Sequence, residues 1–486
     1  MYEAAQPLVS EERSRRKAFI LDLADRLAGQ RSAWIAKNRY FHQSDIEYLK
    51  FLIPRGVSIL DLGCGTGSLL AQLEPANGVG IDFSAAMVEE AKKNYPGLTF
   101  IQGDIENEAV IDNLGQTFDV IVISDTIGSL DDCERTLSSL HRVCNAETRI
   151  VISYYSKLWD PILRLAERLG LKMPQTEQNA LSTEDIEALL ALADFQLVKR
   201  EWRQLLPLRL LGLGTLVNRY LATLPLARRL CLRNYLVAKS ALIRRESRPS
   251  VSVIIPCRNE RGNIESAILR LPRFADEMEV IFVEGHSKDG TLEEALRVQA
   301  NHPEWRIQVM VQDGKGKGDA VRKGFATAQG DILFILDADL TCPPEELPKF
   351  YRALISNKGE VVNGTRLVYP MESQAMRFLN YLANRAFSWL FSWLLNQRLT
   401  DTLCGTKVLY RHHYMRIADN RAYFGDFDPF GDFDLLFGAS KLNFKLVEVP
   451  IRYANRMYGE TQISRFRHGW LLLRMVVFAF RKLKAF

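Results

Sequence analysis

The stretch Ile59-Leu60-Asp61-Leu62-Gly63-Cys64-Gly65-Thr66-Gly67 reads as a buried strand that runs into a glycine-rich turn. Strand-like runs alternate with helical ones on both sides of it, and this alternation is typical of a parallel, doubly wound sheet. The runs are 57–62, 78–81, 98–102, 118–124 and 148–153. Two later runs, 195–201 and 232–239, are expected to add the last strands of this sheet.

A second series of strand-like runs follows a polar, proline-terminated stretch at 241–250. Its members are 251–255, 279–284, 306–312, 331–336 and 360–364. A chain of 486 residues is too long for one ordinary core. The two series carry different motifs, so the sequence predicts a fusion of two unlike α/β domains, both doubly wound. We expect the first domain over 1–240, opened by a helical segment at 11–52, a linker over 241–250 and the second domain over 251–486.

Composition is that of a folded protein, with 47% apolar and 25% charged residues. The seven cysteines show neither CxxC spacing nor a paired framework, which argues for a reducing compartment and against zinc or disulfides. The first ten residues lack the apolar core of a signal peptide. No run approaches the ~18 apolar residues of a spanning helix. We therefore expect a cytoplasmic protein that does not span the membrane.

Positive charge is concentrated in two stretches that contain no acidic residue. Nine basic residues lie within 202–245 and six within 463–486, and both stretches are also rich in leucine or aromatic residues. Cations interleaved with apolar side chains suit an anionic membrane surface, so we expect peripheral attachment to the inner face of the membrane. Two packed helices with solvated arginines are the ordinary alternative. No nucleic-acid recognition motif accompanies the charge, so no nucleic-acid partner is expected.

The glycine turn and the strands beside it carry the first candidate site. Glycine lacks a Cβ, so the turn, with Gly63, Gly65 and Gly67, lets the backbone approach a ligand closely. Asp61 lies two residues before the first glycine, where it can receive an ammonium group or an ordered water. Asp82 closes the next strand and can accept both hydroxyls of a ribose, and Asp104 ends the third strand and can meet an adenine amino group. The alternative is that each acid caps a helix.

These residues resemble the class I S-adenosylmethionine-dependent methyltransferases, over roughly 38–239. The resemblance implies a Rossmann-like fold, S-adenosylmethionine as cofactor and a fourth motif at Ser124-Asp125-Thr126. The candidate bases are Asp125, Tyr40, His42 and His141. Methyl transfer to a good nucleophile needs mainly proximity and alignment, so a reaction without a base stays open.

The second candidate site ends the strand Ile332-Leu333-Phe334-Ile335-Leu336-Asp337-Ala338-Asp339. Residues i and i+2 of a continuing strand share a face, so both carboxylates can address one divalent ion. Such an ion neutralises a diphosphate leaving group. The glycine–lysine stretch at 314–318 lacks the spacing of a Walker loop, and we expect it to be a flexible loop near the phosphates.

Four motifs in this half together resemble inverting family 2 glycosyltransferases of the GT-A fold, in particular the dolichol-phosphate mannosyltransferase-like enzymes, over 250 to about 464. They are Val253–Glu260, Val283–Thr291, Gly314–Gly318 and Asp337–Asp339. The resemblance implies that Asp337 and Asp339 hold Mg²⁺ or Mn²⁺ and the diphosphate. It implies that Arg366 acts on the acceptor side and that Arg452 and Arg456 meet phosphate. The nucleoside would be lined by Pro256, Arg258, Glu260 and Glu284.

The chain departs from that family in three places. Glu284-Gly285-His286-Ser287 stands where Asp-Asp-Gly-Ser is usual, which leaves the nucleoside open, and Thr341 stands where lipid-phosphate enzymes usually have glutamine. Gly431-Asp432-Phe433-Asp434 places carboxylates where glutamine and glutamate are common. Asp432 or Asp434 would serve as base for a hydroxyl acceptor, whereas a phosphate acceptor is already ionised.

An aromatic-rich segment at 378–399 completes the second half. Trp389 and Trp393 lie four residues apart and share a helical face. In the resembling family this region faces the membrane at the acceptor groove, and core packing is the alternative. The sequence as a whole predicts a bifunctional enzyme that methylates and that transfers a sugar to a membrane-associated acceptor, with polyprenyl phosphate favoured. The alternatives are a glycolipid or polysaccharide hydroxyl as acceptor, or one domain serving only for binding or docking.

Overall fold

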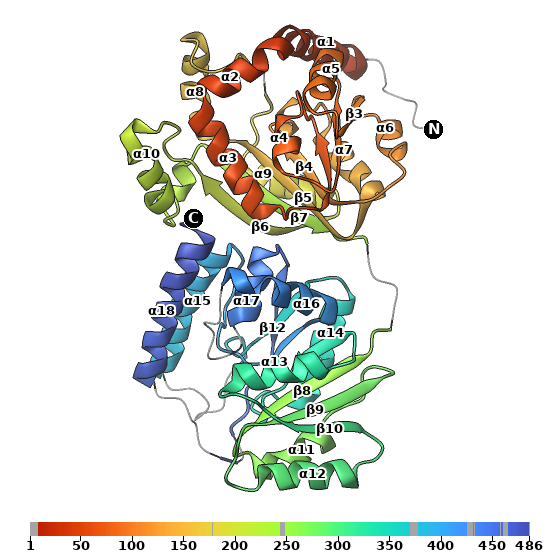
Figure 1. Cartoon of the computed structure of the whole chain (residues 1–486), viewed down its shortest axis with the longest axis vertical. Coiled ribbons are helices and arrows are strands. Elements are labelled where there is room, and N and C mark those ends of the chain that lie inside the picture. The colour runs from red at the N-terminus through yellow and green to blue at the C-terminus, as the bar shows by residue number, and fades with distance from the viewer. Residues whose placement is uncertain are drawn as a thin grey trace. The chain divides into compact units, whose positions relative to one another are not determined.

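The computed structural model describes residues 8–176, 178–243, 248–369, 378–424, 431, 433–456, 458–459 and 465–485. The chain divides into two compact units, Met1–Ile243 and Arg244–Phe486, and each unit is built on its own seven-stranded sheet (Figure 1). The prediction of two α/β domains is confirmed. None of the helices in the described ranges is long and apolar enough to cross a membrane.

The sheet of the first unit has the strand order β3-β2-β1-β4-β5-β7-β6. Its strands are β1 Ser58–Leu62, β2 Asn77–Asp82, β3 Thr99–Gln102, β4 Phe118–Ser124, β5 Cys144–Tyr155, β6 Phe195–Arg203 and β7 Arg233–Ser240. β7 runs antiparallel to both β5 and β6, whereas β1 to β5 pair in parallel. The helices are α1 Leu8–Leu27, α2 Arg31–Lys37, α3 Arg39–Leu52, α4 Ser68–Gln72, α5 Ala85–Asn94, α6 Glu108–Asp112, α7 Cys133–Ser139, α8 Asp160–Arg168, α9 Thr183–Leu192 and α10 Leu213–Leu216.

Alternate residues of the central strands bury into two different cores. Leu60, Ile121 and Ile150 belong to one apolar cluster, whereas Ile59 and Val120 belong to another. Successive side chains of a strand point to opposite faces, so the sheet is covered on both sides. This double burial explains the nearly unbroken apolar runs in β1 and β4.

The sheet of the second unit has the order β10-β9-β8-β11-β13-β12-β14. Its strands are β8 Val251–Cys257, β9 Met278–Glu284, β10 Arg306–Val311, β11 Ile332–Ile335, β12 Val361–Thr365, β13 Lys407–Tyr410 and β14 Leu446–Pro450. β13 is antiparallel to β11 and β12. The helices are α11 Ile264–Leu269, α12 Thr291–Asn301, α13 Lys317–Thr327, α14 Leu347–Ile355, α15 Phe378–Leu395, α16 Arg411–Asp419, α17 Phe433–Lys441 and α18 Arg465–Leu483. β13 and β14 were not among the strands predicted from the sequence.

Not all of the basic residues that we counted toward a membrane surface reach the surface. Arg233, Lys239 and Lys484 are at most 2% exposed. Lys484 donates to Asn396 Oδ1 over 2.6 Å, and Arg233 is held by two aspartates described below. The sequence count therefore overestimates the cations available to a polyanion, because it cannot separate buried charges from exposed ones.

Candidate active sites

The glycine turn after β1 is shaped by close contacts that only glycine permits. Gly63 and Gly67 have positive φ angles of 81° and 75°. A Cβ on Gly63 would stand 2.1 Å from Thr126 Oγ1, and that hydroxyl donates to the Leu62 carbonyl over 2.9 Å. The turn therefore packs directly against the segment that follows β4, as expected for a backbone that must approach a ligand.

A cavity of about 450 Å³ opens beside this turn. It is lined by Gly63 and Gly65, by Asp82 at the end of β2, and by residues of α1, α2 and α3 such as Lys17 and Arg31. The N-terminal helices thus contribute one wall of the cavity. These helices were predicted, and Tyr40 and His42 of α3 were named as candidate bases, but Lys17 and Arg31 were given no part in the site.

Asp61, within β1, has no close hydrogen-bonded cation among the described residues. The residue is 1% exposed, and its Oδ2 makes no hydrogen bond there. Burial, and then the neighbouring Asp82, raise the pKa of Asp61 to about 7, while Arg31 acts in the opposite direction. A buried carboxyl in this state is suited to receive a cationic group of a ligand.

Asp82 and Asp104 already have partners within the chain. The two Asp82 oxygens accept hydrogen bonds from the backbone N–H groups of Gly65, at 2.8 Å, and Ser84, at 3.0 Å. Asp104 Oδ2 accepts from Lys17 Nζ over 2.5 Å. Asp82 therefore holds the turn in addition to any contact with a ribose. Asp104, which we predicted to meet an adenine, is paired with α1 instead.

Asp125 belongs to a buried charge cluster. It has a positive φ of 59° and forms an ion pair with the fully buried Arg233. Arg233 Nε also contacts Asp45 Oδ1 at 3.0 Å, and the Tyr235 hydroxyl donates a hydrogen bond to Asp45. An arginine between two carboxylates fixes both of them, so the prediction of Asp125 as a free base does not match its pairing.

The three other candidate bases lie in different surroundings. His141 hydrogen-bonds the Ser240 hydroxyl and the Ala193 carbonyl and stacks on Phe195, which is a packing role. The Tyr40 hydroxyl accepts from Asn218 over 3.1 Å. His42 lines the cavity, and burial lowers its pKa, which keeps the imidazole neutral. His42 therefore remains the candidate for a general base at this cavity.

The first aspartate of the second site is held by a lysine from the glycine–lysine loop. We had predicted that Asp337 and Asp339 continue the strand, but β11 ends at Ile335 and the two residues lie in the turn that follows it. Lys317 Nζ lies 2.6 Å from Asp337 Oδ1. Although burial opposes ionisation, Lys317, together with Lys407 and Arg366, holds the pKa of Asp337 below its usual range.

The second aspartate is bridged to a nucleoside-site acid by one arginine. Arg456 Nη2 lies 2.7 Å from Asp339 Oδ2, and its Nη1 lies 2.9 Å from Glu260 Oε1. The other Glu260 oxygen accepts from Asn263 over 2.7 Å. Burial, the largest influence, raises the pKa of Glu260. The segment after β14 is thus brought against the ends of β8 and β11, 117 residues away from Asp339 in the chain.

Of the remaining nucleoside-site residues, Glu284 organises its own loop. Its oxygens accept from the backbone N–H groups of Ser287, at 2.5 Å, and His286, at 3.1 Å. Arg258 is exposed and Pro256 half-buried at the end of β8. A Cβ on Gly285 would stand 3.1 Å from Arg258 Cβ, so the two loops are in close contact. The hydrogen bonds of Glu284 therefore fix the conformation of the loop that follows β9.

The predicted acceptor-side residues are largely paired. Arg366 binds Asp401 through Nε at 2.6 Å and Nη2 at 2.8 Å, and the Asp401 carboxylate is fully buried. Asp434 accepts from Arg421 Nε over 2.8 Å. A carboxylate held by arginine is a poor free base, which counts against that role for Asp434. Asp432 lies outside the described residues.

Residues that sequence reasoning missed are Arg31, Lys407 and Asp401, and it gave Lys17 and Lys317 no partner. Lys407 is fully buried in β13 and donates to the Cys404 carbonyl over 2.6 Å. A lysine inside a strand and an aspartate followed by Thr402 carry no motif of their own. A signal existed only for Lys317, which follows Gly314 and Gly316 at the start of α13.

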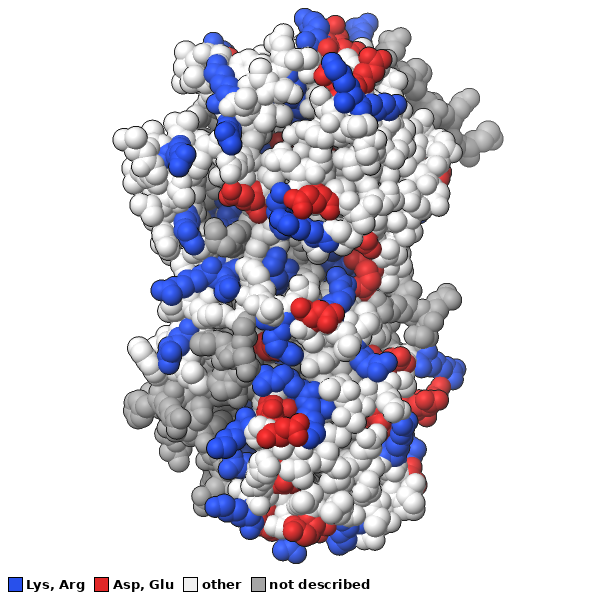
Figure 2. Space-filling model, viewed as in Figure 1, with Lys and Arg blue, Asp and Glu red and all other residues white. Residues whose placement is uncertain are grey.

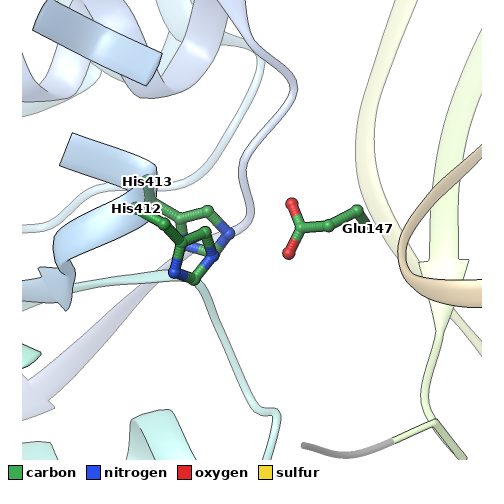
Figure 3. A group of neighbouring side chains, drawn as sticks. All are labelled: Glu147, His412 and His413. Carbon is green, nitrogen blue, oxygen red and sulfur yellow. The ribbon is translucent and has the colours of Figure 1, made fainter. Parts of the chain in front are cut away.

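Two adjacent histidines, His412 and His413, lie in the first turn of α16 (Figure 3), and the figure also draws Glu147 of the first unit. The rings of His412 and His413 lie 4.1 Å apart, and His413 is 1% exposed and packs 4.4 Å from the Phe444 ring. Lone or paired histidines in such apolar packing are usually core residues, and we assign them no catalytic role.

The residues present fit the ligands that the family resemblance implies. The buried unpaired Asp61 oxygen and the glycine turn beside a 450 Å³ cavity fit S-adenosylmethionine. Asp337 and Asp339 provide the oxygen ligands that Mg²⁺ and Mn²⁺ prefer. A Mg²⁺ bound by one or two carboxylates usually takes its other ligands from water and substrate phosphates.

Comparison with known proteins identifies both units. The family model "Methyltransferase domain" matches residues 53–206, and "Glycosyl transferase family 2" matches residues 252–423. Relatives include dolichol-phosphate mannosyltransferases of Pyrococcus furiosus, 38% identical over 120 residues, and Saccharomyces cerevisiae, 38% identical over 109 residues. An undecaprenyl-phosphate 4-deoxy-4-formamido-L-arabinose transferase of Proteus mirabilis is 27% identical over 221 residues.

These matches cover 24%, 21% and 44% of this chain, and they span only 33%, 40% and 63% of the relatives' own lengths. Among solved structures, an S-adenosylmethionine-dependent methyltransferase of Thermotoga maritima is 19% identical, with a TM-score of 0.34. The match covers 45% of this chain and 99% of the Thermotoga maritima chain. Glucosyl-3-phosphoglycerate synthase of Mycobacterium tuberculosis is 18% identical, with a TM-score of 0.35, and covers 48% of this chain and 80% of its own. The chain therefore carries a methyltransferase domain at residues 53–206 and a family 2 glycosyltransferase domain at residues 252–423.

Proposed function

We propose that this protein is a bifunctional enzyme. Its second unit transfers a sugar from a nucleotide diphosphate to a polyprenyl phosphate, with inversion at the anomeric carbon. Its first unit transfers a methyl group from S-adenosylmethionine. The observation that supports the sugar transfer most strongly is the pairing of Asp337 with Lys317 and of Asp339 and Glu260 with Arg456.

This array gathers opposite charges where a nucleotide diphosphate would bind. Asp337 and Asp339 would hold a divalent cation, which neutralises the diphosphate as it leaves. Lys317 and Arg456 would turn from the carboxylates toward phosphate oxygens, because a lysine acts as a point charge and an arginine can bind phosphate through two N–H groups. Glu260 stays hydrogen-bonded to Asn263 and would orient the nucleoside.

The acceptor is inferred to be a phosphate and not a hydroxyl. A phosphate oxygen is ionised at neutral pH, whereas a sugar hydroxyl needs a base to take its proton during attack. Asp434 is paired with Arg421, and this pairing counts against it as that base. The names of the three relatives above also refer to dolichol phosphate or undecaprenyl phosphate. A glycolipid or polysaccharide hydroxyl is the competing acceptor.

The exposed tryptophans of helices α15 and α18 are consistent with an acceptor that lies in the membrane. They pack together, with Trp393 stacked on Phe480 at 5.6 Å. Trp389 and Trp470 are 61% and 66% exposed on the same two helices. Of the two tryptophans that we predicted on one helical face, Trp393 packs against α18 and Trp389 is exposed. Exposed tryptophan is typical of protein surfaces at a membrane interface.

In the first unit, Asp61 would pair with the ammonium group of the methionine moiety. Asp82 would add contacts to a ribose through its remaining lone pairs, since each carboxylate oxygen accepts more than one hydrogen bond. His42, neutral and facing the cavity, would accept a proton from the methyl acceptor if that acceptor needs a base. S-adenosylmethionine supplies the methyl group when it is bound.

The test is to incubate the full chain with a panel of sugar nucleotides, Mg²⁺ or Mn²⁺, and undecaprenyl phosphate in detergent. Mass spectrometry should detect a sugar-phosphate lipid for one nucleotide. The matched control is the corresponding polyprenol, which has the hydroxyl but not the phosphate. Product on the polyprenol or on glycolipids, and not on the phosphate, would refute the phosphate acceptor while leaving glycosyl transfer intact.

A further inference from the structure

The first unit exposes a leucine-rich surface over residues 207–230, which connect β6 to β7. Its leucine side chains are exposed to solvent, which is unfavourable for apolar groups. They include Leu208, Leu210, Leu211, Leu213, Leu216, Leu226 and Leu230, which are between 52% and fully exposed. Leu210 and Leu211 have positive φ angles of 40° and 55°, a strained backbone for leucine. Strain that is kept where it presents apolar side chains to solvent points to a function for this surface.

The helix α8 extends the same surface. The Trp159 Nε1–H donates to the Leu230 carbonyl over 2.8 Å, which ties the start of α8 to the end of the 207–230 segment. Leu158, Ile162, Leu165 and Leu169 are 53–65% exposed. Their spacing of four, three and four residues forms one helical stripe. In Figure 1, α8 and α10 lie on the same side of the first unit. We call the exposed apolar residues of 207–230 and of 158–169, which comprise α8 and the residues at its two ends, the leucine surface.

The charge within the 207–230 segment has one sign, whereas α8 carries Asp160 and Glu167, which pair with Arg164 and Lys172. No acidic residue occurs between 202 and 245. Arg209, Arg219 and Arg229 are exposed within the 207–230 segment, and Arg228 is half-buried with its guanidinium 4.9 Å from the Trp202 ring. Where Figure 1 places α10, Figure 2 shows mostly white atoms with isolated blue and without red. A partner with apolar chains and negative head groups matches this pattern.

The leucine surface also adjoins the cavity of the methyltransferase. Leu163 of α8, together with Leu171 and Leu208, lines the cavity, and Leu171 and Leu208 are 54% and 57% exposed at the same time. The side chains that would enter a bilayer are therefore continuous with those that face the methyl donor. An amphiphile held in the bilayer would reach the cavity without crossing water.

We propose that the leucine surface docks the methyltransferase unit on an anionic bilayer and that the methyl acceptor is an amphiphile taken from that bilayer. The inference about the acceptor rests on the proposed methyl transfer, whereas the docking does not. Leucines that enter the head-group region gain by leaving water, and Arg209, Arg219 and Arg229 are attracted to anionic lipids. This surface is distinct from the exposed tryptophans of α15 and α18.

The docking can be measured on the full chain with a reporter at one site. All seven cysteines are buried, so a cysteine placed on the surface can be labelled selectively with an environment-sensitive fluorophore. The probes are Leu213→Cys and Ile162→Cys, at positions 56% and 53% exposed. The matched control is Leu192→Cys, 70% exposed on α9 and outside the leucine surface. Vesicles contain phosphatidylglycerol, or phosphatidylcholine alone, with brominated acyl chains as quencher.

We expect quenching and a blue shift at 213 and 162 with phosphatidylglycerol vesicles, a much weaker response with phosphatidylcholine, and no response at 192. Replacing Arg209 and Arg229 by alanine should lower the vesicle partition coefficient by roughly tenfold or more. S-adenosylmethionine binding by calorimetry checks that each variant is folded, and its loss in the parent protein would refute the proposed methyl transfer without bearing on docking. Equal quenching at all three positions, or none at 213 and 162, would overturn the proposal. A blue shift that depends on protein concentration without vesicles would overturn it in favour of a second copy of the chain.

Discussion

The acids of the two candidate sites are controlled in opposite ways. In the methyltransferase unit, Asp61 is buried without a bonded cation among the described residues, and its pKa is raised to about 7. In the glycosyltransferase unit, Asp337 is half-buried, and although burial opposes ionisation, Lys317 holds its pKa below the usual range. The contrast matches the charges of the two proposed ligands. A site for a ligand with an ammonium group leaves its acid unpaired, whereas a site for a diphosphate brings cations of its own.

The difference comes from which segments close each site. Lys17 of α1 and Arg31 of α2 line the cavity of the first unit, and Lys17 forms an ion pair with Asp104. The sugar site is closed by two cations, Lys317 at the first position of α13 and Arg456 in the segment after β14. Desolvation therefore dominates at Asp61, whereas ion pairing outweighs it at Asp337.

The largest effect is expected at Asp339. Asp339→Asn removes one of the two carboxylates proposed to hold the metal and leaves Arg456 with Glu260 alone. Sugar transfer should fall by at least ~100-fold, as when one electrostatic stabiliser of a transition state is lost. The measurement is the rate of lipid product formation. Asp276→Asn, whose side chain is 68% exposed, is the control and should keep the parent rate. Near-normal turnover of Asp339→Asn with metal still required would show that the assigned role is wrong.

A second change tests whether the Asp337–Lys317 pair needs its exact position. A Cβ on Gly405 would stand 2.0 Å from Asp337 Oδ2 and 2.4 Å from Lys317 Nζ. Gly405→Ala should therefore displace both groups and lower sugar transfer by about 100-fold, the usual effect of misplacing a catalytic group by about 1 Å. Gly469→Ala, where nothing lies within 4 Å, serves as control. S-adenosylmethionine binding should be unchanged in both variants, and a parallel loss of that binding would indicate general unfolding.

The matching change in the first unit is Asp61→Asn. An ammonium group paired with an ionised carboxylate is expected to lose roughly 10- to 100-fold in affinity when the charge is removed, because hydrogen bonds to charged groups contribute about 1.5–3 kcal/mol. Calorimetric titration with S-adenosylmethionine measures the loss, with Asp112→Asn, 51% exposed, as control. Sugar transfer should not change. Unaltered S-adenosylmethionine affinity would remove Asp61 from the site.

The smallest effect is the pH dependence of the same acid. Since the pKa of Asp61 is about 7, S-adenosylmethionine should bind roughly tenfold more weakly at pH 6 than at pH 7.5, and Asp61→Asn should flatten this profile. Stability without ligand should follow the opposite trend. The folded protein holds this proton more tightly than the unfolded chain, whose pKa is near 3.8, so this group's contribution declines as pH rises from about 4 to 7. Thermal unfolding of parent and variant across this range checks the sign.

Much of the fold could be predicted because its signals are local. The apolar runs of β1, β4, β8 and β9 are buried on both faces and so stand out in sequence. The prediction failed where the strand was short or its role depended on a neighbour. β13 has four residues, includes the buried Lys407 and runs antiparallel between β11 and β12, so nothing local identified it.

The candidate sites divide in the same way. Gly63 and Asp337 were found because turns and acids at strand ends carry recognisable spacing. The prediction that Asp337 and Asp339 continue a strand was wrong, because β11 ends at Ile335 and a turn sets their directions. The pairing of Asp125 with Arg233 was not foreseeable either, since the partners are 108 residues apart.

The sequence by itself determined two α/β units, the glycine turn after β1 and the acids at the strand ends, because these depend on backbone geometry and on residues near one another in the chain. Only the tertiary structure decided which partners those acids have. Whether an aspartate is desolvated and unpaired, like Asp61, or held by a distant cation, like Asp339 by Arg456, depends on which segments fold over it. Electrostatic energies vary steeply with distance and burial, and neither quantity is encoded in local sequence.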